Sequence, residues 1–201
     1  MTDQIDHIDT VGAASKGGVE FDALIDEFRR MHAALCAAFP DPELTTKLRH
    51  EFRRAADQLE LTREPMEADR ASRRVGLSSR GHPTLVPFAV DYLDERVITA
   101  TVEFTDEHLG GNGAVHGGMI PLLFDDLLGV FVGEKGQPHS RTAFLNVNYR
   151  KITPICTPLR VEGTIDRIEG RKTWVSGRLF HGSEVTADAE ALFLRLLPGQ
   201  P

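Results

Sequence analysis

The residues in this sequence that are best suited to chemistry are two adjacent carboxylates, Asp125 and Asp126. They interrupt an apolar run that extends from residue 119 to residue 132. Because burying two ionised carboxylates together is strongly unfavourable, we expect one of them to point toward solvent or a cleft. A carboxylate in partly apolar surroundings holds a proton more strongly, which suits a general base. The alternative is a carboxylate that pairs with an arginine or is only solvated.

A glycine-rich segment, residues 110–119, leads directly into this apolar run. Pro121 indicates a helix that begins near Gly117, because proline is tolerated in a first helical turn, where its missing N–H removes no intrahelical bond. Unpaired N–H groups at that end, with the helix dipole behind them, would suit negative charge that develops on a carbonyl oxygen. The alternative is a loop in which the same glycines serve only to make a tight turn. His116 is then a ligand, a hydrogen-bond donor or an ordinary loop residue.

The apolar run itself predicts a helix from Gly118 to about Val132 that is enclosed on nearly all sides. Runs rich in β-branched and aromatic residues predict six strands, over residues 85–92, 97–104, 142–149, 159–168, 173–180 and 186–196. Asp94 and Glu95 would form the turn between the first two strands. Six strands beside one enclosed helix indicate an α+β domain, with a sheet wrapped around the helix, over residues 85–201.

The first part of the chain has a different content and spacing of apolar residues. Residues 1–19 contain few large apolar groups and are expected to be a flexible tail. Apolar residues then recur at intervals of three and four over residues 20–62, which predicts a helical hairpin broken at Pro40, with Asp41 as the cap of its second helix. Residues 63–84 are polar and predict a linker. The hairpin carries no catalytic pattern; a cap on an exposed core is favoured over a lid or a docking element.

Composition excludes several classes of protein. The formal net charge is −7, so a broad basic face for nucleic acid is not expected. The two cysteines, Cys36 and Cys156, lack metal-ligand spacing, so we expect no metal site. The apolar run is too short to span a membrane, and the first residues resemble neither a signal nor a transit peptide, which favours a cytoplasmic protein. Nucleophile-elbow, metalloprotease and P-loop motifs are absent from the sequence.

In the glycine-rich segment and the apolar run that follows it, the sequence resembles the PaaI-like branch of the hotdog thioesterase superfamily. The signature of that branch is His-Gly-Gly at the start of a central helix, with a carboxylate nine residues after the histidine. The matching residues here are His116, Gly117, Gly118 and Asp125. The likeness covers residues 85–198 and continues through residues 142–149, 169–172 and 189–196. Within the superfamily, the chain looks closest to the acyl-coenzyme A thioesterases called thioesterase superfamily members four and five.

The resemblance implies an antiparallel sheet around a central helix and hydrolysis of an acyl-coenzyme A (acyl-CoA) thioester. It assigns Asp125 to activating or positioning water, or to direct attack that gives an anhydride. It assigns the Gly117 N–H to the thioester oxygen, Thr142 to orienting the water and His116 to shaping the oxyanion site. No cofactor is implied, since CoA is part of the substrate. The superfamily pairs its sheets edge to edge, so a homodimer is the minimum assembly expected, with a tetramer left open.

Substrate contacts are the least specific part of this prediction. The basic pairs Arg150-Lys151 and Arg171-Lys172 lie nearest the motif strands and could bind the phosphates of CoA, although ordinary surface charge explains them equally. The other predicted substrate contacts are Asn112, Gly118 and Asn148. Some relatives place an asparagine six residues before the histidine, where this chain has Gly110. Two other functions stay open: a module that binds acyl-CoA without hydrolysis, and a hydratase or dehydratase.

Overall fold

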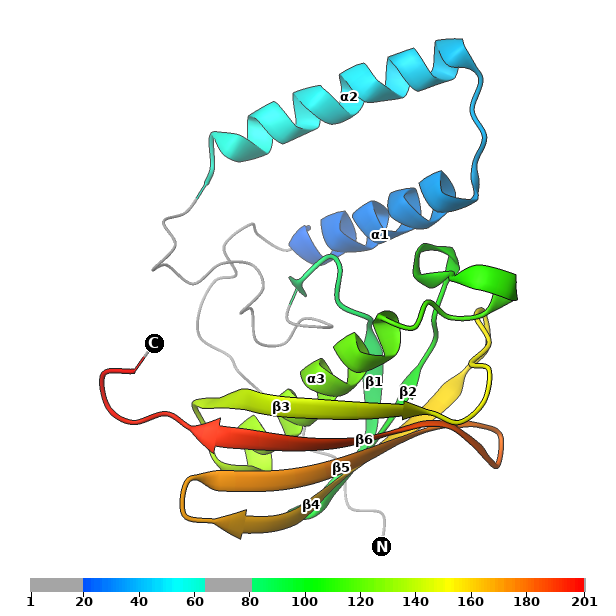
Figure 1. The fold of residues 1–201 in the computed structure, drawn as a ribbon. Helices are drawn as coiled ribbons and strands as arrows, with labels where there is room; N and C mark the ends of the chain where they lie inside the picture. The colour runs from blue at the N-terminus through cyan, green and yellow to red at the C-terminus, as the bar shows by residue number, and fades with distance from the viewer. Residues whose placement is uncertain (1–19, 64–80, 201) are drawn as a thin grey trace, which may run out of the picture. The chain divides into compact units, whose positions relative to one another are not determined.

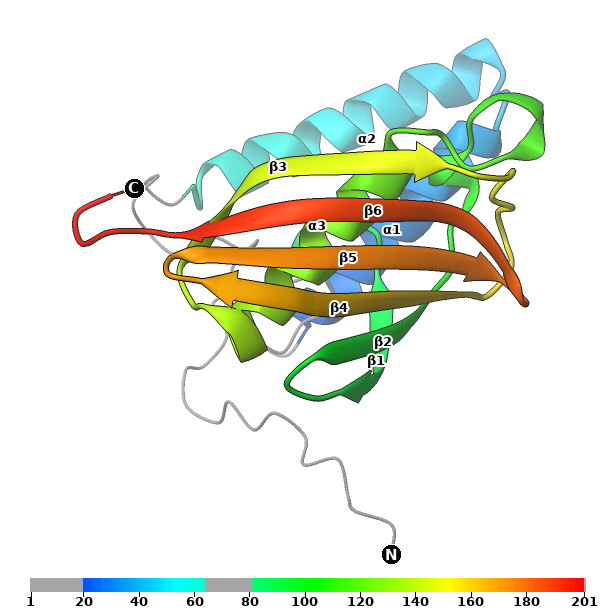
Figure 2. The same ribbon diagram turned by 60° about the horizontal axis from the view of Figure 1, so that its bottom comes forward.

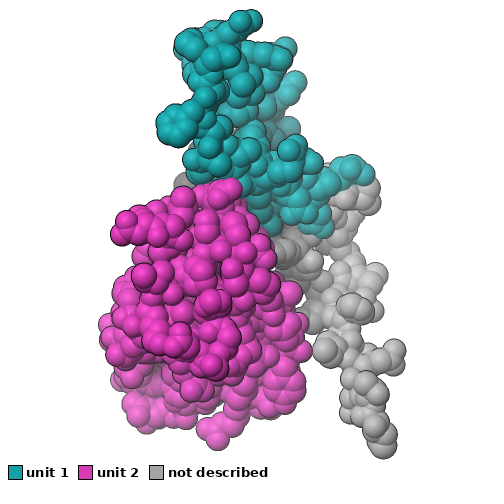
Figure 3. Space-filling model, turned by 90° about the vertical axis from the view of Figure 1, so that its right-hand side faces the viewer, with its two compact units in different colours: residues 1–83 teal, residues 84–201 magenta. Residues whose placement is uncertain are grey.

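The computed structural model describes residues 20–63 and 81–200. Two compact units divide the chain, Met1–Pro83 and Thr84–Pro201 (Figure 3). The first contains α1 (Phe21–Ala37) and α2 (Pro42–Glu60). The Leu44 N–H donates to Asp41 Oδ1 at 2.8 Å, which confirms the predicted cap of the second helix. The predicted tail, residues 1–19, and residues 64–80 of the predicted linker lie outside the described residues.

The second unit is built on one antiparallel sheet. Its strands are β1 (Phe88–Leu93), β2 (Val97–Val102), β3 (Ser140–Tyr149), β4 (Leu159–Glu169), β5 (Lys172–His181) and β6 (Glu184–Arg195). Their order across the sheet is β1-β2-β4-β5-β6-β3, so β1 and β3 are the edge strands (Figure 2). All six predicted strands are confirmed. Their ends differ from the predicted ends by up to three residues, as at β1, which begins at Phe88 rather than residue 85.

Helix α3 (Met119–Phe131) lies across one face of this sheet (Figure 1). Leu123, Phe124 and Leu127 are completely buried, so the predicted enclosure of this helix is confirmed. Two glycines paired across β4 and β5 allow the helix to approach closely. A Cβ on Gly177 would lie 2.8 Å from the Phe124 ring, and a Cβ on Gly163 would lie 2.7 Å from a methyl of Leu128.

Short irregular elements complete the unit: η3 (Asp106–His108), η4 (Gly111–Gly113) and η5 (Val132–Gly136). Neither of the two described stretches contains a helix that is long and apolar enough to cross a bilayer. Within the same residues, no three His, Cys, Asp or Glu side chains gather in a way that could hold a metal ion.

Candidate active site

The two adjacent carboxylates of α3 have different surroundings. Successive helical residues point about 100° apart, and here this places Asp125 in an exposed position while Asp126 is only 5% exposed. The hydroxyl of Thr142, on β3, donates a hydrogen bond to Asp125 Oδ1 at 2.8 Å. The structure therefore brings together the carboxylate and the hydroxyl that the sequence had singled out.

A bulge in β3 directs Thr142 toward the helix. Leu145 and Val147 face α3 and pack against the core, so strict alternation along the strand would place residue 142 on the opposite face. The register shifts between Thr142, which pairs with Phe193, and Phe144, which pairs with Leu192. Ala143 is the extra residue. As a result, the hydroxyl of Thr142 is directed toward Asp125.

The glycine-rich loop before α3 is held by backbone hydrogen bonds. The His116 N–H donates to the His108 carbonyl at 2.7 Å, and the Gly110 N–H donates to the Ala114 carbonyl at 2.7 Å. A Cβ on Gly110 would lie 2.7 Å from the Cα of His116, closer than real Cβ atoms come to a neighbouring backbone. Gly110 therefore cannot be replaced by the asparagine of some relatives unless this loop shifts.

Asn112 lies at the tip of the loop, within η4, and is exposed. Its φ of 58° is in the left-handed region, which asparagine adopts more readily than most residues. Asparagine thus suits the backbone conformation at residue 112. The residue that contacts His116 is Gly110, two residues earlier in the sequence.

The peptide groups at the start of α3 point in defined directions. The His116 carbonyl accepts a hydrogen bond from the Met119 N–H at 2.9 Å. Because a trans peptide directs its C=O and its N–H to opposite sides, the Gly117 N–H points away from the helix. It is exposed and donates to no other described residue. By contrast, the Gly118 N–H is occupied, since it donates to His116 Nδ1 at 3.0 Å.

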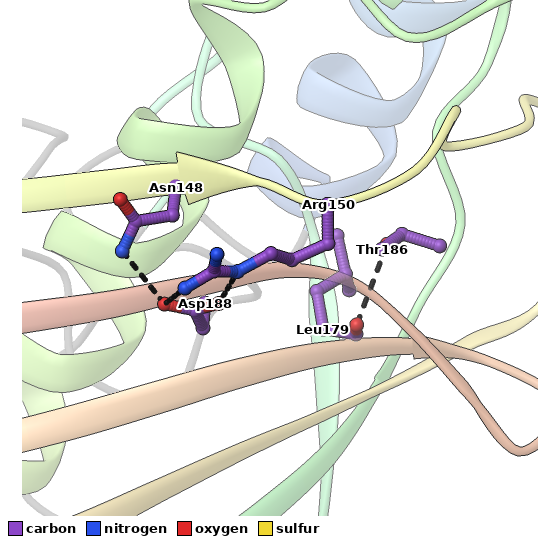
Figure 4. A network of polar contacts seen from close by, with 5 residues as sticks. All are labelled: Asn148, Arg150, Leu179, Thr186 and Asp188. Carbon is purple, nitrogen blue, oxygen red and sulfur yellow. Dashed lines mark hydrogen bonds and ion pairs between the residues drawn. The ribbon is translucent and has the colours of Figure 1, made fainter.

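Asn148 and Arg150 belong to a polar network at the other end of β3 (Figure 4). Both donate to Asp188 on β6, Asn148 at 2.8 Å and the Nη2 of Arg150 at 3.2 Å. Hydrogen bonds from Arg150, reinforced by one from Asn148 and by the charge of Arg150, lower the pKa of Asp188 below its usual 3.8. Asn148 follows Val147 in the strand, so its side chain lies on the face away from α3.

The two predicted basic pairs differ in their partners and their positions. Lys151 is paired with Glu184, as Arg150 is with Asp188. Arg171 donates only to the Arg195 carbonyl, at 3.1 Å, and neither Arg171 nor Lys172 has a carboxylate partner among the described residues. Lys172 shares the cross-strand row of Leu194 and Arg141, whereas Tyr149 pairs with Ala187, seven residues before Leu194 on β6, a separation of about 23 Å along the strand. Within one chain, the two pairs therefore lie near opposite ends of the sheet.

Tyr149 is a polar contact of this site that the sequence reasoning did not assign. Its hydroxyl donates to the Gly117 carbonyl at 2.7 Å. The signal was present in the alternation Leu145, Val147, Tyr149, which places the tyrosine on the face of β3 that carries α3. Its phenol therefore reaches the start of the helix from the last residue of the strand.

The fold and this site define the class of protein: the second unit is a hotdog-fold domain, with an antiparallel sheet wrapped around a central helix. Residues 112–187 match the model of the thioesterase superfamily. A crystal structure described as a thioesterase superfamily protein superposes with a TM-score of 0.74 and 26% identity over 87% of this chain and 90% of its own. The second unit, residues 84–201, makes up only 118 of the 201 residues. A match over 87% of the chain therefore also includes residues of the first unit. The predicted resemblance to the hotdog thioesterase superfamily is thereby confirmed.

Two further comparisons extend the likeness. A protein of Streptococcus mutans bound to acetyl CoA has the same fold, with a TM-score of 0.50 and 20% identity over 53% of this chain and 86% of its own. Acyl-coenzyme A thioesterase THEM4 of mouse is 37% identical over 97 residues, and that of cow is 33% identical over 91 residues. These matches cover 47% and 44% of this chain. The chain spans about two fifths of the length of these curated relatives, 41% and 37%.

Proposed function

We propose that this chain is an acyl-CoA thioesterase, which uses water to cleave the thioester into a free acid and CoA. The relatives named acyl-CoA thioesterases and the superfamily match support this activity. The observation that carries the proposal is the exposed Asp125 carboxylate with the Thr142 hydroxyl bonded to one of its oxygens. The same domain offers an outward-pointing N–H on Gly117, so both a base and an oxyanion donor are present.

In the proposed mechanism, Thr142 holds Oδ1 of Asp125, and Oδ2 accepts a proton from the attacking water. The lone pairs of the Thr142 oxygen accept a hydrogen bond from the same water and orient it. As the water oxygen bonds to the carbonyl carbon, negative charge moves to the thioester oxygen and is stabilised by the Gly117 N–H. The C–S bond then breaks, and CoA leaves as a thiolate, for which a pKa of about 8.5 requires no strong general acid.

Direct attack by Asp125 is the alternative chemistry, and it would form a mixed anhydride that water then opens. Single turnover in ¹⁸O-labelled water reveals the anhydride route when water opens the anhydride at its aspartyl carbonyl. Attack by water places ¹⁸O in the released acid and none in the protein. An anhydride that is opened at its aspartyl carbonyl leaves ¹⁸O in Asp125, which mass spectrometry of the digested protein detects.

The separation of the two catalytic groups supports a site shared between two chains. Eight residues separate Gly117 from Asp125, which is about 12 Å along a helix. A base and an oxyanion donor must each lie near 3 Å from the groups of one thioester. We therefore propose a homodimer in which Gly117 of one chain faces Asp125 of the other. We assign the interface to β3, an open edge strand that carries Thr142.

For the nucleotide of CoA we propose contacts with Arg171 and Lys172, because these two cations have no carboxylate partner within the described residues. Guanidinium and ammonium groups bind phosphate oxygens through charge-assisted hydrogen bonds. Replacing both residues by alanine is expected to raise KM for acyl-CoA about tenfold or more with little change in kcat. An unchanged KM would remove them from the substrate site.

The proposed function is tested by thiol release from short-chain, medium-chain, long-chain and aromatic acyl-CoA substrates. Asp125→Asn should lower turnover by about 10²- to 10⁴-fold, whereas Asp126→Asn should act mainly on stability, since Asp126 is buried. Tight binding of acyl-CoA without thiol release would favour a binding module instead. Loss of enoyl absorbance without thiol release would favour a hydratase.

A further inference from the structure

One peptide group at the start of α3 is held from both sides. The carbonyl of Gly117 accepts a hydrogen bond from the Tyr149 hydroxyl at 2.7 Å. The N–H of the same peptide group, which belongs to Gly118, donates to Nδ1 of His116 at 3.0 Å. Because Nδ1 accepts, the proton of the neutral imidazole is on Nε2. Gly117–Gly118 is thus a peptide plane whose two polar ends both have side-chain partners.

This plane needs such partners because two successive glycines have wide conformational freedom. Rotation of the Gly117–Gly118 plane changes ψ of Gly117 and φ of Gly118, whereas the Gly117 N–H belongs to the preceding peptide group. The preceding peptide group is fixed at its carbonyl by the Met119 N–H at 2.9 Å. The hydroxyl and ring of Tyr149 hold Gly117 itself, whose Cα is the other end of that peptide group, so the Gly117 N–H keeps both its place and its direction, away from the helix.

We propose that Tyr149 is a positioning residue, whose hydroxyl and ring hold Gly117 in place and thereby keep the Gly117 N–H in position for the thioester oxygen. This inference rests on the proposed function. Tyr149 does not touch the reacting atoms; it acts through the peptide that it holds. Oxyanion donors are effective because their direction is set before charge develops, so a residue that sets the direction contributes to the rate rather than to substrate affinity.

The surroundings of Tyr149 suit this role. Its ring atoms lie 3.8 and 3.9 Å from the position of a Cβ on Gly117, so the phenol lies against the glycine as well as bonding to it. The end of β3 next to Tyr149 is fixed, since the Arg150 N–H donates to the Thr186 carbonyl at 2.8 Å. Thr186 is itself bonded to the Leu179 carbonyl at 3.3 Å (Figure 4). Tyr149 therefore connects the sheet to the helix N-terminus.

The chain offers a matched control, because it contains only two tyrosines. Tyr92 also donates a hydrogen bond from an exposed phenol at 2.8 Å, but to Asp94 at the β1–β2 turn. Tyr149→Phe and Tyr92→Phe each remove one hydroxyl and keep the ring. We expect Tyr149→Phe to lower kcat roughly tenfold, less than the ~10²–10³-fold lost with an oxyanion donor itself. KM should stay within about twofold, and Tyr92→Phe should behave as the wild type.

A second measurement does not depend on activity. In ¹H–¹⁵N spectra, the amide signals of Gly117 and Gly118 should shift or broaden in Tyr149→Phe and stay in place in Tyr92→Phe. Unchanged glycine signals together with wild-type kcat would overturn the inference. A lower Tm with unchanged kcat would also overturn it, because the hydroxyl would then be only structural. If the wild type released no thiol from any acyl-CoA, the proposed function would fail, while the glycine signals would still decide whether Tyr149 locks the peptide.

Discussion

The Thr142 hydroxyl donates a hydrogen bond to Asp125 Oδ1 at 2.8 Å and so links edge strand β3 to helix α3 across 17 residues of sequence. The bond restricts rotation of the carboxylate, whose side chain is otherwise exposed. The Oδ2 atom accepts no hydrogen bond from the described residues and is left for a reactant. In the proposed reaction, Thr142 therefore determines which oxygen of Asp125 takes the proton of water.

Replacing Thr142 by valine tests this role, because valine keeps the branched shape and removes the hydroxyl. A hydrogen bond to a charged group contributes about 1.5–3 kcal/mol, so we expect kcat to fall by about 10- to 150-fold in a thiol-release assay. Thr101→Val is the matched control, since the Thr101 hydroxyl bonds to Asp91 at the same 2.8 Å on the β1–β2 hairpin. Equal activities of the two variants would contradict the assignment.

Gly110 gives a prediction about the loop. A Cβ at this position would meet backbone atoms of His116 at 2.7 and 3.0 Å, so Gly110→Ala and Gly110→Asn must displace the loop. We expect each to lower the free energy of unfolding by about 1–3 kcal/mol and to reduce turnover, measured by thermal melts and by thiol release. The neighbouring Gly111→Ala is the control, because a Cβ there meets nothing within 4 Å. A gain of activity in Gly110→Asn would show that the loop adapts to it.

The sequence predicted the elements of the hotdog domain better than the directions of its side chains. The helix and the six strands follow from local patterns, the apolar run around Asp125 and the β-branched segments. The bulge at Ala143 does not, because it depends on how β3 and β6 align, and a one-residue slip reverses the face that Thr142 occupies. By contrast, the alternation of side chains along β3 could have placed Tyr149 on the face of the strand that carries α3.

The basic pairs illustrate the same limit of local patterns. Arg150 and Lys151 pair with carboxylates 38 and 33 residues later in the sequence, on β6 or at its start. These contacts are set by strand register and cannot be read from the two residues themselves. The choice between Asp125 and Asp126 was easier. The spacing from His116 favoured Asp125, and the structure leaves that carboxylate exposed.

Asp188 predicts a pH dependence of stability. Its pKa is lowered in the folded chain, first of all by the hydrogen bond from Arg150. A lowered pKa means that the ionised form stabilises the fold above the usual value of 3.8, and that this contribution is lost as the pH falls through the lower folded value. Thermal melts of the wild type and Asp188→Asn should therefore differ by a constant amount from pH 5 to 7 and converge below about pH 4. A difference that does not change with pH would exclude the ionised pair as its cause.

The two-chain site predicts recovery of activity in mixed dimers. Asp125→Asn removes the base, and Gly117→Pro removes the oxyanion N–H, so each homodimer should have little activity. Random exchange of subunits makes half of the dimers hybrids, and each hybrid has one intact site of two, so the mixture should reach about 25% of wild-type turnover.

This recovery requires that both variants fold and form dimers, which circular dichroism and light scattering check before they are mixed. A one-chain site predicts the opposite result, because every subunit in the mixture then carries a defect and turnover stays at the level of the separate variants. The exchange of differently tagged subunits, followed by affinity capture, shows whether hybrids have formed. Hybrids without activity would place Gly117 and Asp125 of the same chain at one thioester and would contradict the 12 Å separation argument.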